Sequence, residues 1–393
     1  MRKVESLLFL FSIYLPLFIT NIIIHKLNLI SFSKEVETIE ENYFKNNSYH
    51  KLLKAIKEGY EPTLFPAAWI KDGFKKNIYP LASQVYTNVT LCDEGYGLIK
   101  YKTDRFGLRN DDDKWNNLFN DEVKEISLFI GDSFVQGACV ENKNTINNIF
   151  QSITKITSLN LGNGSGDPAN YNQTLKQFVK PIVSKTDKTF NVFIIFYPND
   201  NILFKGESEE SKIKFIEPLD FKDKNITFKK DYLSSIENIF NKNKISAEDL
   251  QRKFMEDRKD LSLLEISKRY IFLSYLRHYF AHISGIPFQI DYSENSISAK
   301  SISTLKDVCQ SKKCNPYVAF LPHSDYWRPD KRAMKYKQHL IKFAKKNNIK
   351  FLDLTKAFDQ KEKVNFAPYG PHYSNLGYQK VGKYLSEIFI RYK

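Results

Sequence analysis

Two residues far apart in the chain, Ser133 and His372, are of types that could act together as a nucleophile and its base. Ser133 stands in the run Gly131-Asp132-Ser133-Phe134, directly after the apolar stretch 126–130, which is typical of a buried strand. A serine at this place can face the C-terminal edge of a parallel sheet, where ligands bind in open α/β folds. Histidine is the side chain that most often activates a serine. Either residue alone fits an ordinary loop, so the prediction depends on the pair and on what lies between them.

Groups that could hold negative charge follow two further predicted strands. The glycine-rich stretch 159–168 follows one strand, and Pro198-Asn199-Asp200 follows the strand 190–197. A glycine lets the backbone approach a substrate closely and turn its N–H inward. An N–H and an asparagine amide that converge on one point can stabilise the oxyanion of a tetrahedral intermediate.

Four short blocks in this order resemble the SGNH (GDSL) hydrolase family. They are G-D-S-F at 131–134, N-L-G-x-G-x-G at 160–166, Y-x-N-D at 197–200 and G-x-H-Y at 370–373. The resemblance covers about residues 90–204 and 314–393. It implies that Ser133 is the nucleophile, His372 the base and Asn199 an oxyanion donor. The second oxyanion donor is Gly166, or Gly164 one turn position earlier.

The flanking residues extend the resemblance and suggest a substrate. Residues 101–110 (YKTDRFGLRN) and 135–140 (VQGACV) are similar to members encoded with bacterial cell-surface polysaccharides. The predicted activity is an ester hydrolase or acyltransferase that moves an O-acyl group, acetyl above all, on a cell-envelope glycan through an acyl-enzyme on Ser133. The alternative is a non-catalytic glycan-binding or assembly protein that keeps the same fold.

The expected acid beside the histidine is missing. Most members of the family place an aspartate two or three residues before the histidine, and here those positions are Gly370 and Tyr369. Three carboxylates elsewhere are candidates to orient the imidazole: Asp353, Asp359 and Asp167. A backbone carbonyl could also orient the ring. This gap is what keeps the non-catalytic alternative open.

The chain begins with an apolar segment that predicts a membrane anchor. Residues 6–24 carry no charge and follow Arg2 and Lys3. At a rise of ~1.5 Å per residue this segment approaches the ~30 Å hydrocarbon layer, and it lacks the small-residue site of a cleaved signal peptide. We therefore expect a single-pass protein with a cytoplasmic start and its catalytic domain outside the cytoplasm.

The four cysteines agree with an oxidising compartment. Their positions favour a Cys92–Cys139 bridge and a Cys309–Cys314 bridge, and none has zinc-ligand spacing with histidine. Four free, buried thiols are the alternative. The bridge between Cys92 and Cys139 would hold the incoming segment beside the Ser133 turn.

The composition and charge of the chain limit the classes of partner that we expect it to bind. The formal net charge is +14 over 393 residues, and the lysines are spread along the chain rather than gathered in a stripe. The sequence has no signature of a nucleic-acid-binding fold, so we expect the basic residues to lie on a solvent-exposed surface. Motifs for phosphate loops, dinucleotides and metals are missing too, so no cofactor and no metal are predicted.

The order of the elements predicts an α/β protein. Strands at 126–130, 156–161, 190–197, 316–321 and 349–353 alternate with helical patterns, which favours a parallel sheet covered on both faces. The resemblance makes this a flavodoxin-like three-layer α/β/α sandwich. The expected organisation is an anchor at 1–30, a polar stem at 31–89, and a hydrolase-like domain at 90–393 with an insertion at about 205–313. Amphipathic patterns predict helices at 263–283, within the insertion, and at 375–392, at the C-terminus.

Overall fold

The computed structural model describes residues 2–27, 39–79, 81–201, 213–250, 252, 263–284, 292–310, 313–323, 331–358 and 362–393. A five-stranded sheet forms the centre, with the order β10-β9-β6-β4-β5 and parallel pairing throughout. Its strands are β4 (Glu125–Ile130), β5 (Thr157–Asn160), β6 (Thr189–Phe196), β9 (Cys314–Phe320) and β10 (Lys350–Asp353). All five lie where the sequence predicts them, and the α/β class is confirmed.

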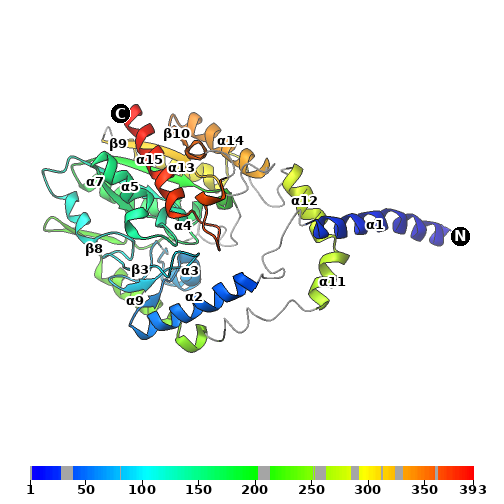
Figure 1. The fold of residues 1–393 in the computed structure, drawn as a ribbon. Coiled ribbons are helices and arrows are strands. Elements are labelled where there is room, and N and C mark those ends of the chain that lie inside the picture. Colours follow the sequence, from blue (N-terminus) through cyan, green and yellow to red (C-terminus); the bar gives the residue numbers. More distant parts are fainter. Residues whose placement is uncertain are drawn as a thin grey trace.

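Helices cover both faces of this sheet, because successive side chains of each strand point to opposite sides and both sides are apolar. In β6, Val192 and Ile194 belong to one buried cluster, and Phe193 and Ile195 belong to the other. The first cluster includes side chains of α6 (Pro168–Thr174), α13 (Ile297–Val308) and α14 (Lys331–Lys346). The second includes side chains of α5 (Ile146–Thr154) and α15 (Asn375–Tyr392), so the sandwich has three layers (Figure 1).

The strand order creates a place for a ligand. Numbered in chain order, the strands run 2-1-3-4-5 across the sheet, so β5 is added on one side of β4 and β6 on the other, and the strand order reverses between β4 and β6. Ligands of such sheets bind at this switch point, beyond the carboxyl ends of the two strands. Ser133 follows β4 and Asn199 follows β6, so both lie at the switch point.

Residues that the sequence predicts to be a polar stem are part of the packed domain. The segment holds α2 (Ile39–Lys57), β1 (Glu61–Pro62) and α3 (Pro66–Lys75), and its Trp69, Ile78 and Tyr79 are buried in the first cluster. β1 pairs with β2 (Asn88–Thr90), which also pairs with β3 (Lys100–Lys102). Hydropathy averaged over the segment hides these few large apolar side chains.

The long excursion between β6 and β9 divides into parts with different roles. β7 (Leu219–Lys222), β8 (Asn225–Phe228) and α9 (Lys230–Asn243) add side chains to the first cluster. The helix predicted at 263–283 is two helices, α11 (Leu263–Ile271) and α12 (Ser274–Ser284), and Leu273 between them has a positive φ of 51°. α13 is the crossover helix that covers the sheet, so the excursion outside the sandwich ends before residue 297.

The N-terminal segment forms helix α1 (Arg2–Lys26), which projects from the rest of the molecule beside α11 and α12 (Figure 1). Near its C-terminal end, the buried Asn21 accepts a hydrogen bond from the Leu276 N–H at 2.8 Å, and Ile24 packs against Tyr275. Within the described ranges, no helix combines the length and the apolar character that crossing a membrane requires. The membrane anchor predicted at 6–24 stays a prediction.

Shorter helical segments join the layers. They are η1 (Asp112–Leu118), α4 (Ser133–Gln136), η2 (Asn142–Asn144), η3 (Leu175–Val179), α7 (Lys180–Lys185), η4 (Pro198–Asn201), η5 (Leu354–Ala357) and η6 (Lys363–Asn365). The C-terminal helix α15 begins as predicted, where the Ser374 side chain accepts a hydrogen bond from the Gly377 N–H at 3.0 Å.

Both predicted disulfides are present. Cys92 and Cys139 are bonded with their Cα atoms 5.0 Å apart, and Cys309 and Cys314 are bonded with their Cα atoms 4.8 Å apart. The first bridge lies near the carboxyl edge of the sheet, six residues after Ser133. The second closes the turn into the start of β9, at the opposite edge.

Candidate active site

Ser133 begins the short helix α4 on a tight turn that only glycine permits. A Cβ on Gly131 would lie 2.3 Å from the Val135 side chain and 2.9 Å from the Ile195 carbonyl oxygen. Asp132 caps the helix, because its carboxylate accepts a hydrogen bond from the Phe134 N–H at 2.9 Å. The turn thus presents the Ser133 hydroxyl at the switch point of the sheet.

His372 lies on the loop that precedes α15 and reaches Ser133 directly. Its Nε2 is 2.8 Å from the Ser133 Oγ, within the range expected for a nucleophile and its base. The loop is held by a hydrogen bond from the Ala367 N–H to the His372 carbonyl at 2.8 Å, and the imidazole packs against the Phe134 ring. The structure therefore brings the two predicted residues together.

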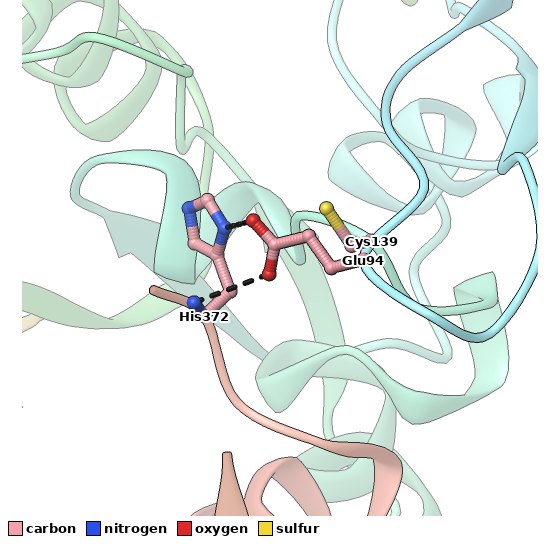
Figure 2. Close-up of side chains that lie close together, drawn as sticks. All are labelled: Glu94, Cys139 and His372. Carbon is pink, nitrogen blue, oxygen red and sulfur yellow. Dashed lines mark hydrogen bonds and ion pairs between the residues drawn. The ribbon is translucent and has the colours of Figure 1, made fainter. Parts of the chain in front are cut away.

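Glu94 supplies the acid that the sequence analysis did not find. One of its carboxylate oxygens lies 2.7 Å from the His372 Nδ1, and the other accepts a hydrogen bond from the His372 backbone N–H at 3.2 Å (Figure 2). Glu94 is 8% exposed, so the pair is shielded from solvent. Ser133, His372 and Glu94 thus form a continuous hydrogen-bonded chain.

The glycine that replaces the expected aspartate makes room for Glu94. A Cβ on Gly370 would lie 1.9 Å from the carboxylate carbon of Glu94 and 2.4 Å from its Cγ. A side chain at this position and Glu94 in its present place exclude each other. The acid therefore comes from a segment other than the histidine loop, and its contact with Nδ1 is of the kind that orients a catalytic histidine.

The three carboxylates proposed from the sequence do not orient His372 in the described structure. Asp353 caps η5 by accepting from the Thr355 N–H and pairs with Lys337 at 3.1 Å. Asp167 caps α6 by accepting from the Asn170 N–H at 2.9 Å. Asp359 lies outside the described residues. One signal did point to Glu94, which stands two residues after a cysteine predicted to bridge to the Ser133 turn.

The predicted oxyanion donors differ in what they already bind. The 163–166 turn lies beside the nucleophile turn, since the Asn163 N–H donates to the Gly131 carbonyl at 3.0 Å. The Gly166 N–H donates within its own turn to the Asn163 carbonyl at 2.9 Å. The Gly164 N–H has no hydrogen-bond partner among the described residues, so it is the freer donor of the two glycines. Asn199 is exposed, and its amide also has no partner in the described part of the chain.

Two buried carboxyl groups lie behind the nucleophile turn. Burial raises the pKa of Asp132 to about 6, and its second carboxylate oxygen has no hydrogen-bond partner. Asp200 accepts hydrogen bonds from the Tyr171 hydroxyl at 2.9 Å and from the Tyr197 N–H at 2.7 Å. Burial, together with the nearby Asp132 carboxylate, raises the pKa of Asp200 well above its usual value. The pair therefore resists carrying two negative charges.

Residues 101–110, one of the two blocks that extend the resemblance, stabilise the turn that carries Ser133. The Arg109 guanidinium is buried and donates to the Gly137 carbonyl at 2.5 Å and to the Val140 carbonyl at 2.6 Å, just beyond α4. Asp104 is also buried and accepts from the Asn110 amide at 2.9 Å and the Trp115 indole at 2.8 Å. This block fixes the backbone on which Ser133 depends.

One group of side chains has donor types that suit a metal ion. Atoms of Glu94, Cys139 and His372 lie within 4.8 Å of one another (Figure 2). The Cys139 sulfur is bonded to Cys92, however, so it is not a thiolate, and the His372 Nδ1 already faces the Glu94 carboxylate. In this oxidised state the three residues do not fit a metal ion.

Comparisons with known proteins add a likeness in fold. No protein-family model matches the chain, and no curated protein matches it. Solved structures that are similar to it include a carbohydrate acetylesterase from Sinorhizobium meliloti, with 8% identity, a TM-score of 0.36, and coverage of 69% of this chain and 100% of that one. A member of the lipolytic G-D-S-L family from Veillonella parvula has 14% identity, a TM-score of 0.35, and coverage of 68% and 99%.

A mutant of an acetylxylan esterase from Geobacillus stearothermophilus has 11% identity, a TM-score of 0.34, and coverage of 67% of this chain and 93% of that one. At such identities and scores the likeness carries no argument about function.

Proposed function

We propose that this protein is a serine-dependent enzyme that cleaves or transfers O-acyl groups through an acyl-enzyme on Ser133. One observation carries the proposal. The Ser133 hydroxyl, the His372 imidazole and the Glu94 carboxylate form a chain of hydrogen bonds of 2.8 Å and 2.7 Å. The acid in this chain removes the reason for the non-catalytic alternative, which was the lack of a partner for His372.

Each residue has a defined role in the proposed reaction. The Ser133 oxygen attacks the ester carbonyl while the His372 Nε2 accepts the hydroxyl proton. Glu94 accepts a hydrogen bond from Nδ1–H, holds the tautomer in which Nε2 is free to accept, and stabilises the imidazolium that forms. The Gly164 N–H and the Asn199 amide are the proposed donors to the oxyanion. His372 then gives its proton to the departing alcohol.

The acceptor in the second half of the reaction determines whether the protein is an esterase or a transferase. Water attacking the acyl-enzyme makes the protein an esterase, and a sugar hydroxyl makes it a transferase. The same acyl-enzyme serves both reactions. We propose an acetylated glycan of the cell envelope as the substrate, on the resemblance carried by residues 101–110 and 135–140.

We also propose that the catalytic domain works outside the cytoplasm. Two disulfides in one chain support this placement, because such bonds persist in oxidising compartments and are rare in the cytosol. Labelling of intact cells with a membrane-impermeant probe tests it, since a domain inside the cytoplasm would be protected.

The decisive experiment uses a fluorophosphonate probe, which reacts covalently with activated serines. Wild type should be labelled and should hydrolyse a small acetyl ester, whereas Ser133→Ala should do neither. Ser152→Ala is the matched control, because Ser152 is exposed on α5, away from the site. Labelling of Ser133→Ala at the wild-type rate would reject the proposal.

A further inference from the structure

The Cys92–Cys139 disulfide joins the two segments that carry opposite ends of the proposed triad. Glu94 stands two residues after Cys92, and Ser133 stands six residues before Cys139. A carboxylate oxygen of Glu94 and the Cys139 sulfur lie within 4.8 Å of each other (Figure 2). The bond therefore lies close to the contact between acid and base.

Among the described residues, the other hydrogen bonds and ion pairs of the Glu94 loop attach it to the nucleophile side only indirectly. The loop closes on itself through hydrogen bonds between Leu91 and Ile99, at 2.9 Å, and between Ile99 and Cys92, at 3.0 Å. Asp93 binds Lys51 of α2 at 2.8 Å, and the Glu94 carbonyl accepts from the Tyr369 N–H at 3.3 Å. These contacts tie the loop to α2 and to the histidine loop, and neither segment carries Ser133.

At its other end, the disulfide is held on a rigid support. Cys139 has a left-handed backbone with φ of 61°, which is uncommon for a residue with a side chain. Two nearby carbonyls, that of Gly137 two residues before it and that of Val140 directly after it, accept hydrogen bonds from the buried Arg109. Such a conformation persists only where the surroundings enforce it. Cys139 therefore offers the Glu94 loop a fixed point beside Ser133.

We propose that the Cys92–Cys139 disulfide is a positioning element that holds Glu94 against His372, so that the full catalytic rate depends on this bond. The inference rests on the proposed function. Because the acid comes from a segment other than the histidine loop, a covalent tie replaces the short stretch of backbone that would otherwise hold it. Losing the tie leaves Ser133 and His372 in place and weakens only the support of the imidazole.

The other disulfide is a matched control. Cys309 and Cys314 are joined over a sequence separation of 5, at the start of β9, a strand length of ~20 Å from the edge that carries the site. We compare Cys92→Ser/Cys139→Ser with Cys309→Ser/Cys314→Ser, each pair replaced together so that no unpaired thiol remains. The full chain is used throughout, with circular dichroism and thermal unfolding to verify the fold.

The expected result is a fall in kcat of ~10²–10⁴-fold for the first pair, similar to that of Glu94→Gln, with KM for a small acetyl ester nearly unchanged. The second pair should keep the wild-type kcat. In the Glu94→Gln background, removing the first disulfide should cost almost nothing more, because both changes remove the same support. An equal loss with and without Glu94 would mean a general structural role and would overturn the proposal.

Chemical reduction of the wild type covers the case in which the serine pair fails to fold. A dithiol reductant transfers two electrons and two protons to the bond, giving two cysteine thiols and an oxidised dithiol, and a chelator keeps stray metal from the freed thiols. Activity should fall with reduction and return on reoxidation, and Cys309→Ser/Cys314→Ser should behave in the same way. Unchanged kcat in the reduced protein would overturn the inference while Ser133 labelling still supported the proposed function.

Discussion

Ser133 and Glu94 reach the same imidazole from two very different kinds of backbone. Ser133 sits on a strand, turn and helix whose local sequence already indicates them, from the apolar β4 to Gly131 and the Asp132 cap. Glu94 sits on a loop outside the central sheet, and contacts with residues 51, 139 and 369–372 place it. The difference suggests that the nucleophile is robust and that the acid is the adjustable member of the triad.

Removing the shared base should have the largest effect. His372→Ala leaves both Ser133 and Glu94 but breaks the proton path between them, and loss of such a base typically costs ~10⁴–10⁶ in kcat. Steady-state hydrolysis of a small acetyl ester measures the loss, with His50→Ala, an exposed residue of α2, as the control. If His372→Ala stayed within tenfold of wild type, the hydrogen bond to Ser133 would have no catalytic meaning.

Changing the acid should cost less than changing the base. Glu94→Gln keeps the shape of the side chain but removes the charge, so the imidazolium loses its partner and the tautomer is no longer fixed. We expect kcat to fall by ~10²–10⁴-fold while labelling of Ser133 continues at a reduced rate. Glu141→Gln removes a nearby exposed carboxylate and should match wild type. A fall as deep as that of His372→Ala would contradict the view of Glu94 as the adjustable member.

Gly370 gives a sharper test, because its effect should depend on Glu94. Gly370→Ala introduces a Cβ into the space of the Glu94 carboxylate, 1.9 Å from its carbon, so the carboxylate must leave Nδ1. In the wild-type background the activity should fall toward that of Glu94→Gln. With Glu94→Ala already present, the same change meets no carboxylate and should be nearly neutral. Additive losses in this double-mutant cycle would show that Gly370 acts through something other than Glu94.

The same contrast explains what could be predicted from the sequence. The five strands, the Ser133 turn, His372 and both disulfides follow from local patterns and simple pairing, and all were predicted. Glu94 was missed because no local pattern links it to His372, 278 residues away. The buried Trp69 was assigned to a polar stem for a related reason, since its burial depends on a cluster built from distant segments. The contact between the end of the N-terminal helix and α12 also joins distant segments, so hydropathy could not predict it, and the membrane span at 6–24 stays a prediction.

Asp132 tests the robust side of the comparison, and its effect should be the smallest. Burial raises its pKa from 3.8 to about 6, so the folded protein holds this proton more tightly than the unfolded chain does. The stabilisation from that proton is complete below pH ~4 and is lost as the pH rises through about 6, a difference of at most about 3 kcal/mol.

Asp132→Asn carries no such charge and keeps an oxygen that can accept a hydrogen bond from the Phe134 N–H. The stability of the variant relative to wild type should therefore rise between pH 4 and pH 7, as measured by denaturant unfolding at both values. Asp121→Asn, which changes an exposed carboxylate, should show no such trend. If the difference between Asp132→Asn and wild type were the same at both pH values, the buried carboxyl would already be ionised at pH 4, and the nucleophile turn would carry a charge that the folded protein tolerates.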